Sequence, residues 1–463
     1  MTLVNDIPVA APEKARLADS IKAAFATPGP DSNGSSRRIR RIGVDIEPLD
    51  PLSWLASQPH KQKVYWSDRN ADFATAGIGS AIRLQGTAPV DTVHLFDGIA
   101  DYLDDNCPDL RFYGGMSFAN TPPQEPEWQP FGTYCFTVPR FEVVIGKHGL
   151  SRFVCNVCVD PEQSPYEQSQ ELLSELDGIR ILEDTNEFAM PRHISRCDRP
   201  GREGWDERVA QALELLRSGM LEKIVLARKS AFVFPSKLNP WTILQQLKAE
   251  SDHCFHFCFQ PDGGPAFIGA SPERLYWRCG RDFRCEAIAG TRLRGDSPAH
   301  DVELANELLE SDKDKCEHRF VVNRLHESLP VLCDSFTLDA DVSVLKLSRV
   351  QHLFQACGGR LRDAVRDADI ISALHPTPAV GGVPTAEAMQ QIKHLEPFER
   401  GWYAGPVGWI GPDAADFAAA IRVALVNECE LVVYSGAGIV DGSSPEREWL
   451  EIENKIENFI SRR

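Results

Sequence analysis

The stretches CFHFCFQ, residues 254–260, and AFIGASPERLYWRCG, residues 266–280, indicate the fold class of this chain. Aromatic and other apolar residues dominate both stretches, and a short segment rich in Gly and Pro separates them. They therefore read as strands joined by a tight turn. A turn this short joins antiparallel strands, because a parallel pair needs a crossover of a dozen or more residues.

Outside these stretches, helices and strands mix without regular alternation. Residues 205–234 contain an amphipathic helix that ends near Gly219, followed by a strand over 224–234. Residues 301–329 read as a long helical stretch, and another helix begins near Pro445. This mixture favours an α+β fold with large, mostly antiparallel sheets flanked by helices over a doubly wound parallel sheet.

Three regions follow from composition along the chain. Residues 1–42 include a segment rich in Gly, Pro and Ser and then Arg, and we expect a flexible N-terminal tail there. Residues 43–200 read as a strand-rich part of the same fold. Residues 201–463 carry the candidate site residues.

The charge of the chain limits its partners. The 463 residues carry 49 Lys and Arg against 67 Asp and Glu, a formal net charge of −18. Such a chain is a poor candidate for capturing nucleic acid or anionic lipid. An anionic substrate would need local positive charge from Arg, Lys, a helix N-terminus or a metal. No run of 18 apolar residues predicts a membrane span, and no secretory signal is visible, so we expect a cytoplasmic protein.

The 13 cysteines do not form a disulfide framework. Their number is odd and most lie in apolar runs, so we expect reduced, mostly buried thiols. Cys155 and Cys158 form a CxxC pair inside an alternating pattern, which favours a core strand over a metal or redox site.

The last helix is the clearest element, in GSSPEREWLEIENKIENFISRR, residues 442–463. Ser443 or Ser444 can cap it, and Pro445 suits its first position. Two of its faces differ: an apolar stripe contains Trp449, Ile452, Ile456 and Phe459, and a charged face contains Glu448, Glu451 and Lys455. Taken alone, the charged face reads as solvated surface.

A second helical segment repeats the arrangement, because Asp314 and Glu317 lie three residues apart on one face. Carboxylates from two helices can converge on one hard divalent cation such as Mg²⁺, which prefers oxygen ligands. The alternative is again an exposed charged face.

Seven ordered motifs resemble one enzyme family. They are EKIVLAR (222–228), FIGASPERL (267–275), AGTR (289–292), KDKCEH (313–318), HPTPAVGG (375–382), SGAGIV (435–440) and SSPEREWLEIENK (443–455). Together they resemble the chorismate-utilising enzymes, which include anthranilate synthase component I, aminodeoxychorismate synthase, salicylate synthase and isochorismate synthase. The segments KVYWSDRN (63–70) and RFYGGMSF (111–118) further resemble isochorismate synthases of the menaquinone pathway.

The resemblance implies a fold and a chemistry. The fold would be anthranilate synthase component I-like, with stacked sheets and an active site between them, so 201–463 would be the chorismate-binding catalytic region. In isochorismate synthases, water adds at C2 of the ring while the C4 hydroxyl departs. That reaction needs a base for the water and an acid for the hydroxyl.

The resemblance also implies a role for individual residues. Lys223 matches the base, a task that requires a neutral amine and hence desolvation, whereas its alternative is an ordinary lysine at the start of a strand. Glu273 matches the general acid, which must be protonated before turnover, and its alternative is a turn glutamate paired with Arg274.

For the metal, Glu317 and Glu451 match the Mg²⁺ ligands, and Asp314 and Glu448 match carboxylates that hold the ligands' waters. The cation would bind the ring carboxylate, which explains how an acidic chain could hold a dianion.

For the substrate, Arg422 matches the grip on the pyruvyl carboxylate, together with backbone N–H groups near Gly436 and Gly438. His352 matches a histidine near the departing hydroxyl, and its alternative is a buried core histidine. The remaining residues that match substrate-binding positions are Gly290, Thr291, Ala379, Tyr403, Ile421 and Lys455.

Two positions discriminate within the family. Ala289 stands where some aminodeoxychorismate synthases have a lysine nucleophile, and Ala379 stands where anthranilate and salicylate synthases typically have threonine. The sequence therefore predicts an isochorismate synthase that acts on chorismate with Mg²⁺ and needs no obligate protein partner. Salicylate synthase, which continues to eliminate pyruvate, and anthranilate synthase component I are the alternatives.

Overall fold

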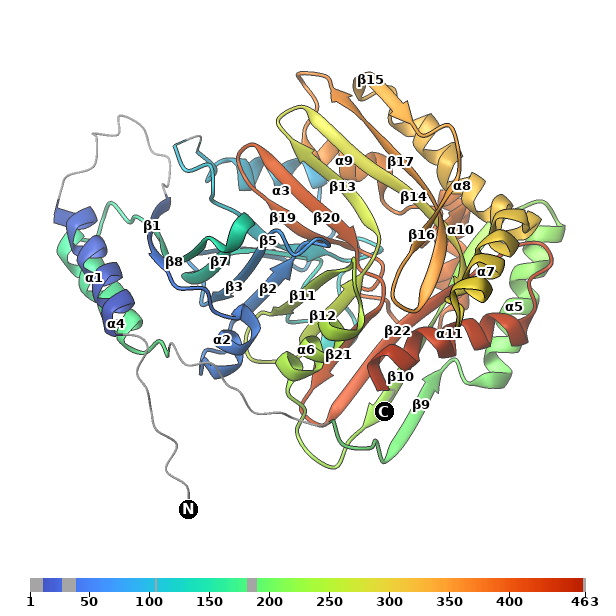
Figure 1. Ribbon diagram of the computed structural model, residues 1–463, viewed down its shortest axis with the longest axis horizontal. Coiled ribbons are helices and arrows are strands. Elements are labelled where there is room, and N and C mark those ends of the chain that lie inside the picture. The colour runs from blue at the N-terminus through green and yellow to red at the C-terminus, as the bar shows by residue number, and fades with distance from the viewer. Residues whose placement is uncertain (1–10, 27–38, 105, 181–189, 461–463) are drawn as a thin grey trace.

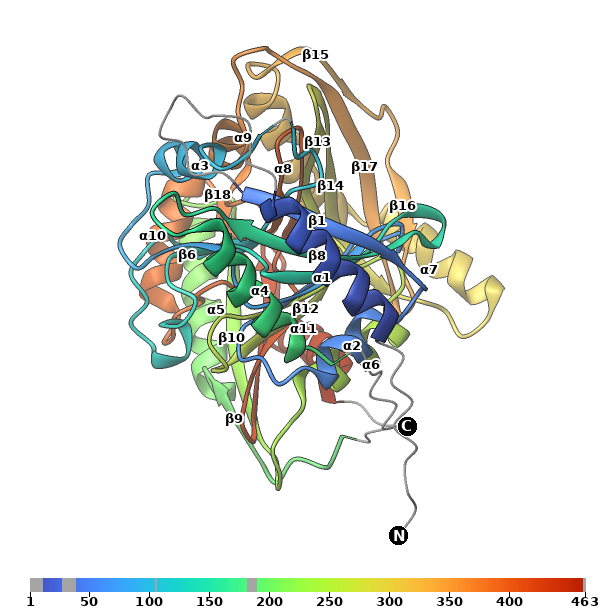
Figure 2. The same ribbon diagram turned by 90° about the vertical axis from the view of Figure 1, so that its left-hand side faces the viewer.

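Two large antiparallel sheets make up the framework of the protein (Figures 1 and 2). The computed structural model describes residues 11–26, 39–104, 106–180 and 190–460. Within them every pair of neighbouring strands runs antiparallel. The predicted α+β class with antiparallel sheets is confirmed.

The larger sheet contains twelve strands in the described part of the chain. Their order across the sheet is β1 (Ile39–Ile46), β8 (Ser151–Cys158), β7 (Phe141–Ile145), β3 (Ala74–Ile78), β2 (Lys63–Ser67), β11 (Phe255–Gln260), β12 (Ala266–Ser271), β21 (Val423–Asn427), β22 (Glu430–Ile439), β10 (Lys223–Val233) and β18 (Gly382–Val383), with β9 (Ser195–Arg199) also paired to β10.

The smaller sheet contains ten strands by the same count. Their order is β15 (Cys333–Leu338), β17 (Val350–Leu361), β14 (Asp282–Leu293), β13 (Arg274–Cys279), β20 (Ala414–Ala419), β19 (Pro406–Ile410), β5 (Phe112–Met116), β6 (Tyr134–Val138) and β4 (Ile82–Gly86), with β16 (Ser343–Lys346) also paired to β17. Both sheets thus combine strands from before and after residue 200.

Helices cover the outer parts of the sheets. They are α1 (Ala11–Ala26), α2 (Pro51–Ser57), α3 (Thr92–Ala100), α4 (Pro165–Asp177), α5 (Arg202–Arg217), α6 (Pro240–Glu250), α7 (Pro298–Glu310), α8 (Asp312–Ser328), α9 (Asp367–Leu374), α10 (Thr385–Leu395) and α11 (Pro445–Ile460), with short 3₁₀ turns at Pro126–Trp128 and Lys147–Gly149. In Figure 1, α1 and α4 lie at one end of the molecule, and α7, α8 and α11 lie toward the other. No helix in the described ranges is both long and apolar enough to cross a membrane.

Several sequence predictions are confirmed by these elements. The helix and strand predicted over 205–234 correspond to α5 and β10, and Gly219 has a φ of 74° just after the helix. Helix α11 begins at Pro445, and Ser444 Oγ caps it by accepting the N–H of Arg447 at 3.4 Å. Cys155 and Cys158 lie on strand β8, as predicted.

Other predictions are wrong or incomplete. The stretch 301–329 is not continuous: Ser311 separates α7 from α8 and caps α8 by accepting the N–H of Asp314 at 3.3 Å. The expected tail over 1–42 is wrong for residues 11–26, where Leu17 and Ile21 of α1 are fully buried, and for residues 39–42, which begin strand β1. Residues 1–10 and 27–38 of that tail lie outside the described residues.

The cysteine prediction also needs a correction. Cys285 of β14 and Cys357 of β17 are register partners and form a disulfide. They lie 72 residues apart in the chain, so their pairing follows from the strand register and not from any local pattern. The buried residues Cys135, Cys155, Cys254, Cys258 and Cys333 are thiols, as predicted.

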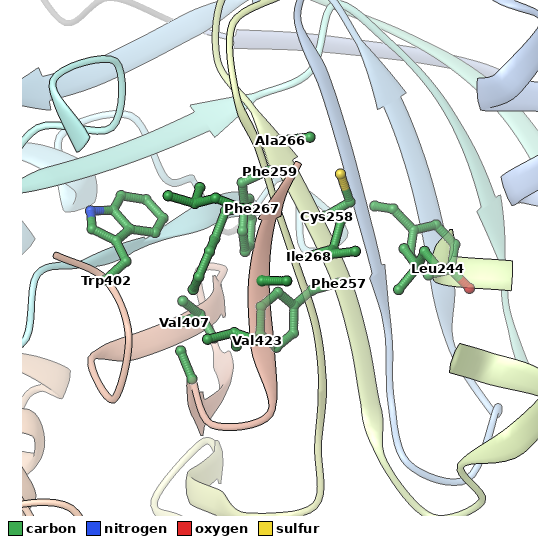
Figure 3. Close-up of a cluster of buried hydrophobic side chains, with 14 of the residues drawn as sticks. Leu244, Phe257, Cys258, Phe259, Ala266, Phe267, Ile268, Trp402, Val407 and Val423 are labelled. Atoms are coloured by element: carbon green, nitrogen blue, oxygen red, sulfur yellow. The ribbon is translucent and has the colours of Figure 1, made fainter. Parts of the chain in front are cut away.

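The main core lies where aromatic side chains of the larger sheet meet the loop before β19 (Figure 3). The rings of Phe257 and Phe267 are 5.8 Å apart, and the ring of Trp402 lies 5.9 Å from Phe259 and 6.2 Å from Phe267. Truncating one such ring to Ala typically costs about 3–5 kcal/mol, so this cluster is a large part of what holds the sheets together.

The chain passes directly from one sheet to the other at two neighbouring places. Strand β12 of the larger sheet leads through Glu273 into β13 of the smaller sheet, and β20 of the smaller sheet leads through Arg422 into β21 of the larger. Backbone hydrogen bonds join the two crossings: Ala419 N donates to Glu273 O at 3.1 Å, and Ala270 N donates to Arg422 O at 3.1 Å. These crossings bring Glu273 and Arg422 to the junction between the sheets.

Candidate active site

A cavity of about 500 Å³ lies at this junction. Its walls come from β14 and β17 of the smaller sheet, β22 of the larger sheet and helices α8 and α11. All residues of the predicted site except Lys223 line it: Glu273, Gly290, Thr291, Asp314, Glu317, His352, Ala379, Tyr403, Ile421, Arg422, Gly436, Gly438, Glu448, Glu451 and Lys455. The folded chain therefore brings residues from all the predicted motifs to one place.

Lys223 reaches the site from behind its wall. It is the first residue of β10, its side chain is fully buried, and its Nζ donates to Glu317 Oε1 at 2.9 Å. Gly438 on the neighbouring strand leaves room for this pair. A Cβ at Gly438 would lie 2.7 Å from Glu317 Oε1 and 3.1 Å from Lys223 Cε, so any side chain there would push the pair apart.

Glu273 is a buried carboxyl group at the crossing between the sheets. Burial raises the pKa of Glu273 to about 7, although the positive charge of Lys223 acts in the opposite direction. The alternative reading, a turn glutamate paired with Arg274, does not apply, because Arg274 forms its ion pairs with Asp416 and Glu286. Near neutral pH, Glu273 can therefore carry a proton that it could donate.

Helices α8 and α11 meet at the cavity, and each of their four carboxylates is paired with a cation. The pairs are Glu317 with Lys223 at 2.9 Å, Glu451 with Lys455 at 2.8 Å, Glu448 with Lys313 at 2.9 Å and Asp314 with Arg292 at 2.8 Å. The Lys313–Glu448 pair joins the two helices directly. The reading of these carboxylates as two separate solvated faces is thus excluded.

At Glu317 and Glu448, burial acts to raise the pKa and the neighbouring cations act to lower it. Burial raises the pKa of Glu448 in spite of Lys313. Burial would also raise the pKa of Glu317, but Lys223, Lys313 and Lys455 outweigh it and hold that pKa below its ordinary value. Glu317 therefore stays an anion at neutral pH.

The donor chemistry of this wall suits a hard cation. Asp314, Glu317, Glu448 and Glu451 present only carboxylate oxygens to one cavity, and such oxygens are the ligands that Mg²⁺ prefers. No group of three or more His, Cys, Asp or Glu side chains in the described residues is already gathered as a complete metal site. The arrangement fits a cation that takes one or two protein carboxylates and fills its other positions with water or substrate oxygens.

Arg422 is a buried cation that faces the same cavity. Its backbone has a φ of 52°, and burial lowers its pKa. Among the described residues no carboxylate forms an ion pair with it, and its Nη2 lies 3.2 Å from His352 Nε2. A guanidinium held without a counter-ion beside a cavity is suited to bind a carboxylate of a ligand.

Sequence reasoning missed three basic residues of the site. Arg292, Lys313 and Arg447 also line the cavity. Arg292 and Lys313 belong to the quoted motifs and adjoin residues that were predicted, so proximity in sequence was an available signal. Arg447 had the same signal, because it belongs to the last of the quoted motifs and adjoins Glu448, although an exposed arginine in the first turn of a helix is also ordinary surface composition.

A second cavity of about 680 Å³ adjoins the first. Six residues line both cavities: Thr291, Arg292, Arg422, Arg447, Glu451 and Lys455. The two cavities therefore form one continuous depression, with the predicted site residues at one end.

Proteins of one enzyme family resemble this chain over most of its length. The family profile described as chorismate binding enzyme matches residues 22–462. Isochorismate synthase 2, chloroplastic, of Arabidopsis thaliana is 34% identical to this chain over 98% of the chain and 85% of the relative. Isochorismate synthase MenF of Escherichia coli strain K12 is 31% identical over 93% of each protein.

Solved structures give the same result. MenF, the menaquinone-specific isochorismate synthase from Escherichia coli, aligns with a TM-score of 0.84 and 27% identity, covering 96% of this chain and 98% of that chain. Anthranilate synthase component I from Streptococcus pneumoniae, at a TM-score of 0.66 and 20% identity over 95% of this chain and 96% of that chain, shares the fold. Because the family profile spans most of the sequence and relatives above 30% identity cover nearly all of it, this protein belongs to the family of chorismate-binding enzymes.

Proposed function

We propose that this enzyme is an isochorismate synthase, which converts chorismate to isochorismate. The observation that carries the proposal is one cavity lined by a carboxyl group with a pKa of about 7, four carboxylates from two helices and an arginine that pairs with no carboxylate among the described residues. A buried lysine lies directly behind its wall. These are the groups needed to hold a dianionic ring and to exchange one of its hydroxyl groups for water.

The reaction requires two proton transfers, one from the water that attacks C2 and one to the hydroxyl group that leaves C4. Lys223 can act as the base only in its neutral form, after its ammonium group has released a proton. In that form it takes a proton from the water that attacks C2, the ring double bonds shift, and the C4–O bond breaks. Glu273 donates its proton to the departing hydroxyl, which leaves as water, so the reaction is an isomerisation. Arg422 holds the pyruvyl carboxylate, and its fixed position sets which ring carbons face Lys223 and Glu273.

The same site would hold Mg²⁺ at Glu317 and Glu451, with Asp314 and Glu448 accepting hydrogen bonds from its waters. When bound, Mg²⁺ supplies the positive charge that binds the ring carboxylate next to four acidic side chains. Glu451→Gln should weaken Mg²⁺ binding measured by calorimetry in the absence of substrate by about tenfold or more. Unchanged calorimetric affinity would reject Glu451 as a ligand.

The test of the function is product identification. Purified protein incubated with chorismate and Mg²⁺ should yield isochorismate by NMR, and chelation of the metal with EDTA should stop the reaction. Salicylate with pyruvate would instead indicate salicylate synthase. Anthranilate on addition of ammonium would indicate the amine-forming branch, and unchanged chorismate would reject the function altogether. Ala379 at the position where those branches typically carry threonine favours the first outcome.

The similarity to the menaquinone-specific enzyme extends over 96% of this chain, including the strand-rich part before residue 200. We therefore place the product in menaquinone synthesis, in the cytoplasm and without an obligate partner subunit. Deleting the gene should create a growth requirement that menaquinone relieves. Relief by salicylate alone would assign the product to another route.

A further inference from the structure

His352 makes contacts in the cavity that define its protonation state. Its Nδ1 lies 3.0 Å from Gly290 O and 3.2 Å from Thr291 Oγ1, and its Nε2 lies 3.2 Å from Arg422 Nη2. A carbonyl oxygen can only accept a hydrogen bond, so Nδ1 carries the ring proton. A guanidinium can only donate, so Nε2 is unprotonated and accepts from Arg422.

Both ring nitrogens are therefore occupied by the protein. Protonating Nε2 would place two donors and two positive charges against each other in a site where His352 is 6% exposed. In agreement, burial and the charge of Arg422 lower the pKa of His352 to about 3. Neutral His352 has no proton at Nε2 to give to a departing hydroxyl, a task for which Glu273 is better suited.

The backbone around His352 supports this tautomer. Gly290 has a φ of 71° and lies at an irregularity in the pairing of β14 with β17, between Ala289 and Thr291. This conformation favours glycine, and it is the one in which the Gly290 carbonyl receives the Nδ1–H group. A Cβ at Gly290 would also lie 3.0 Å from Asp314 Cβ, so two constraints keep this position free of a side chain.

Apart from His352, the thiol of Cys254 is a polar side chain that contacts Arg422. Arg422 has no carboxylate partner among the described residues, and its side chain has several rotatable bonds. A guanidinium that must bind a carboxylate through two parallel hydrogen bonds binds more tightly when its plane is fixed beforehand.

We propose that His352 is a positioning residue: as a neutral Nδ1–H tautomer it accepts a hydrogen bond from Arg422 and fixes the guanidinium that binds the substrate carboxylate. This assignment rests on the proposed function and gives His352 a role beyond the expected place near the departing hydroxyl. It predicts that His352 acts on substrate binding through Arg422 and not on the chemical step.

A double-mutant cycle tests the assignment. The variants are His352→Leu, Arg422→Met and the double variant, and kcat and KM for chorismate are measured at fixed Mg²⁺. We expect His352→Leu to raise KM about tenfold or more while kcat falls much less. In the Arg422→Met background the same change should alter kcat/KM by less than about threefold. A loss of about 100-fold or more in kcat in both backgrounds would overturn the proposal, because that is the signature of a lost proton donor.

A conservative variant separates positioning from proton transfer. His352→Gln retains an oxygen that can accept from Arg422 but has no titrating proton, so it should keep most of the kcat/KM that His352→Leu loses. Equal losses in the Gln and Leu variants would count against positioning.

A spectroscopic measurement does not depend on turnover. In ¹⁵N NMR of histidine-labelled enzyme, the signal missing in His352→Gln should show a protonated Nδ1 and an unprotonated Nε2, unchanged between about pH 8 and about pH 5. A proton on Nε2 in that range would overturn the tautomer. If the wild-type enzyme makes no isochorismate, the proposed function is rejected. If the wild-type enzyme makes isochorismate but the fold-losses in kcat/KM of the two single variants multiply in the double variant, only the role of His352 is rejected.

Discussion

Glu273 links a single side chain to the pH behaviour of the whole protein. An unfolded glutamate ionises near pH 4.5, whereas burial raises the pKa of Glu273 to about 7 in the folded enzyme. Below pH 4.5 both states are protonated and no penalty arises. As the pH rises from 4.5 to 7 the unfolded chain releases a proton that the folded chain keeps, so stability falls.

Glu273→Gln should therefore stabilise the enzyme at high pH and not at low pH. The expected gain is about 3 kcal/mol at pH 8 and close to zero at pH 4, from a shift of roughly 2.5 pKa units at about 1.4 kcal/mol each. Thermal melts of both proteins across this range provide the check. A difference that does not vary with pH would mean that Glu273 ionises normally. In the wild-type enzyme, kcat should decline above about pH 7 as the donor loses its proton.

Lys223 permits a test of the base with a matched control on the same strand. Lys223→Gln keeps a donor for Glu317 but cannot accept a proton, so kcat should fall at least about 100-fold with the fold retained. Lys229→Gln, also on β10, removes a lysine that pairs with Glu125 and Glu127 away from the cavity, and kcat should stay within about twofold of wild type. Near-normal turnover by Lys223→Gln would reject the base assignment.

At the scale of elements, strand β22 can lie close to helix α8 because residue 438 of β22 is a glycine. Gly438→Ala would place a Cβ 2.7 Å from Glu317 Oε1 and 3.1 Å from Lys223 Cε, so the carboxylate of Glu317 must shift and its contact with Lys223 should weaken. We expect kcat/KM to fall about tenfold or more while the circular dichroism spectrum is unchanged. Gly98→Ala in α3, where a Cβ meets nothing within 4 Å, is the control and should stabilise the enzyme by about 0.5–1 kcal/mol without affecting activity. Full activity in Gly438→Ala would show that the Lys223–Glu317 contact is dispensable.

Helix α1 offers a test at the opposite end of the molecule. Leu17 is fully buried where α1 packs against α4 and β1, so Leu17→Ala should destabilise this part by about 2–5 kcal/mol. Hydrogen exchange should accelerate in α1, α4 and β1 and remain slow in β22 and α11. Lys22→Ala, on the exposed face of α1, is the control and should change neither. Uniform acceleration throughout the molecule would mean that α1 is part of the global folding unit.

The elements also show what the sequence could and could not predict. Local patterns were sufficient for α5, β10 and α11, because caps, periodicity and Gly219 all act within a few residues. The candidate site residues came from the resemblance of seven short motifs to one family, and all of them except Lys223 line one cavity. The ion pairs of the site were not predictable. Lys313 and Glu448 are 135 residues apart, and they meet because the fold brings α8 and α11 to the same cavity. Helix α1 was missed because its buried residues are few and the Gly-Pro-Ser segment that follows it dominated the interpretation.

On the scale of the whole molecule, a net charge of −18 opposes the approach of a dianionic substrate. Arg447 lies where the two cavities join and forms no ion pair with any described residue, so it is well placed to attract the substrate. Arg447→Glu should lower kcat/KM about tenfold at low ionic strength, and the loss should shrink as salt is added. Arg217→Glu, an exposed arginine at the end of α5, is the control for charge alone. A loss that is independent of salt would indicate direct contact and not attraction over distance.

The paired crossings at Glu273 and Arg422 determine what can vary in an enzyme of this architecture. The segments that carry the proposed proton donor and the proposed carboxylate anchor are joined by main-chain hydrogen bonds. The distance between these two residues is therefore set by the backbone and should be insensitive to side-chain substitutions nearby. We therefore expect the substrate ring to bind in one orientation, independently of the side chains that line the rest of the cavity. New reactions on the same ring would then arise by changing which nucleophile reaches C2, and redesign should begin on the Lys223 side of the cavity and leave the two crossings untouched.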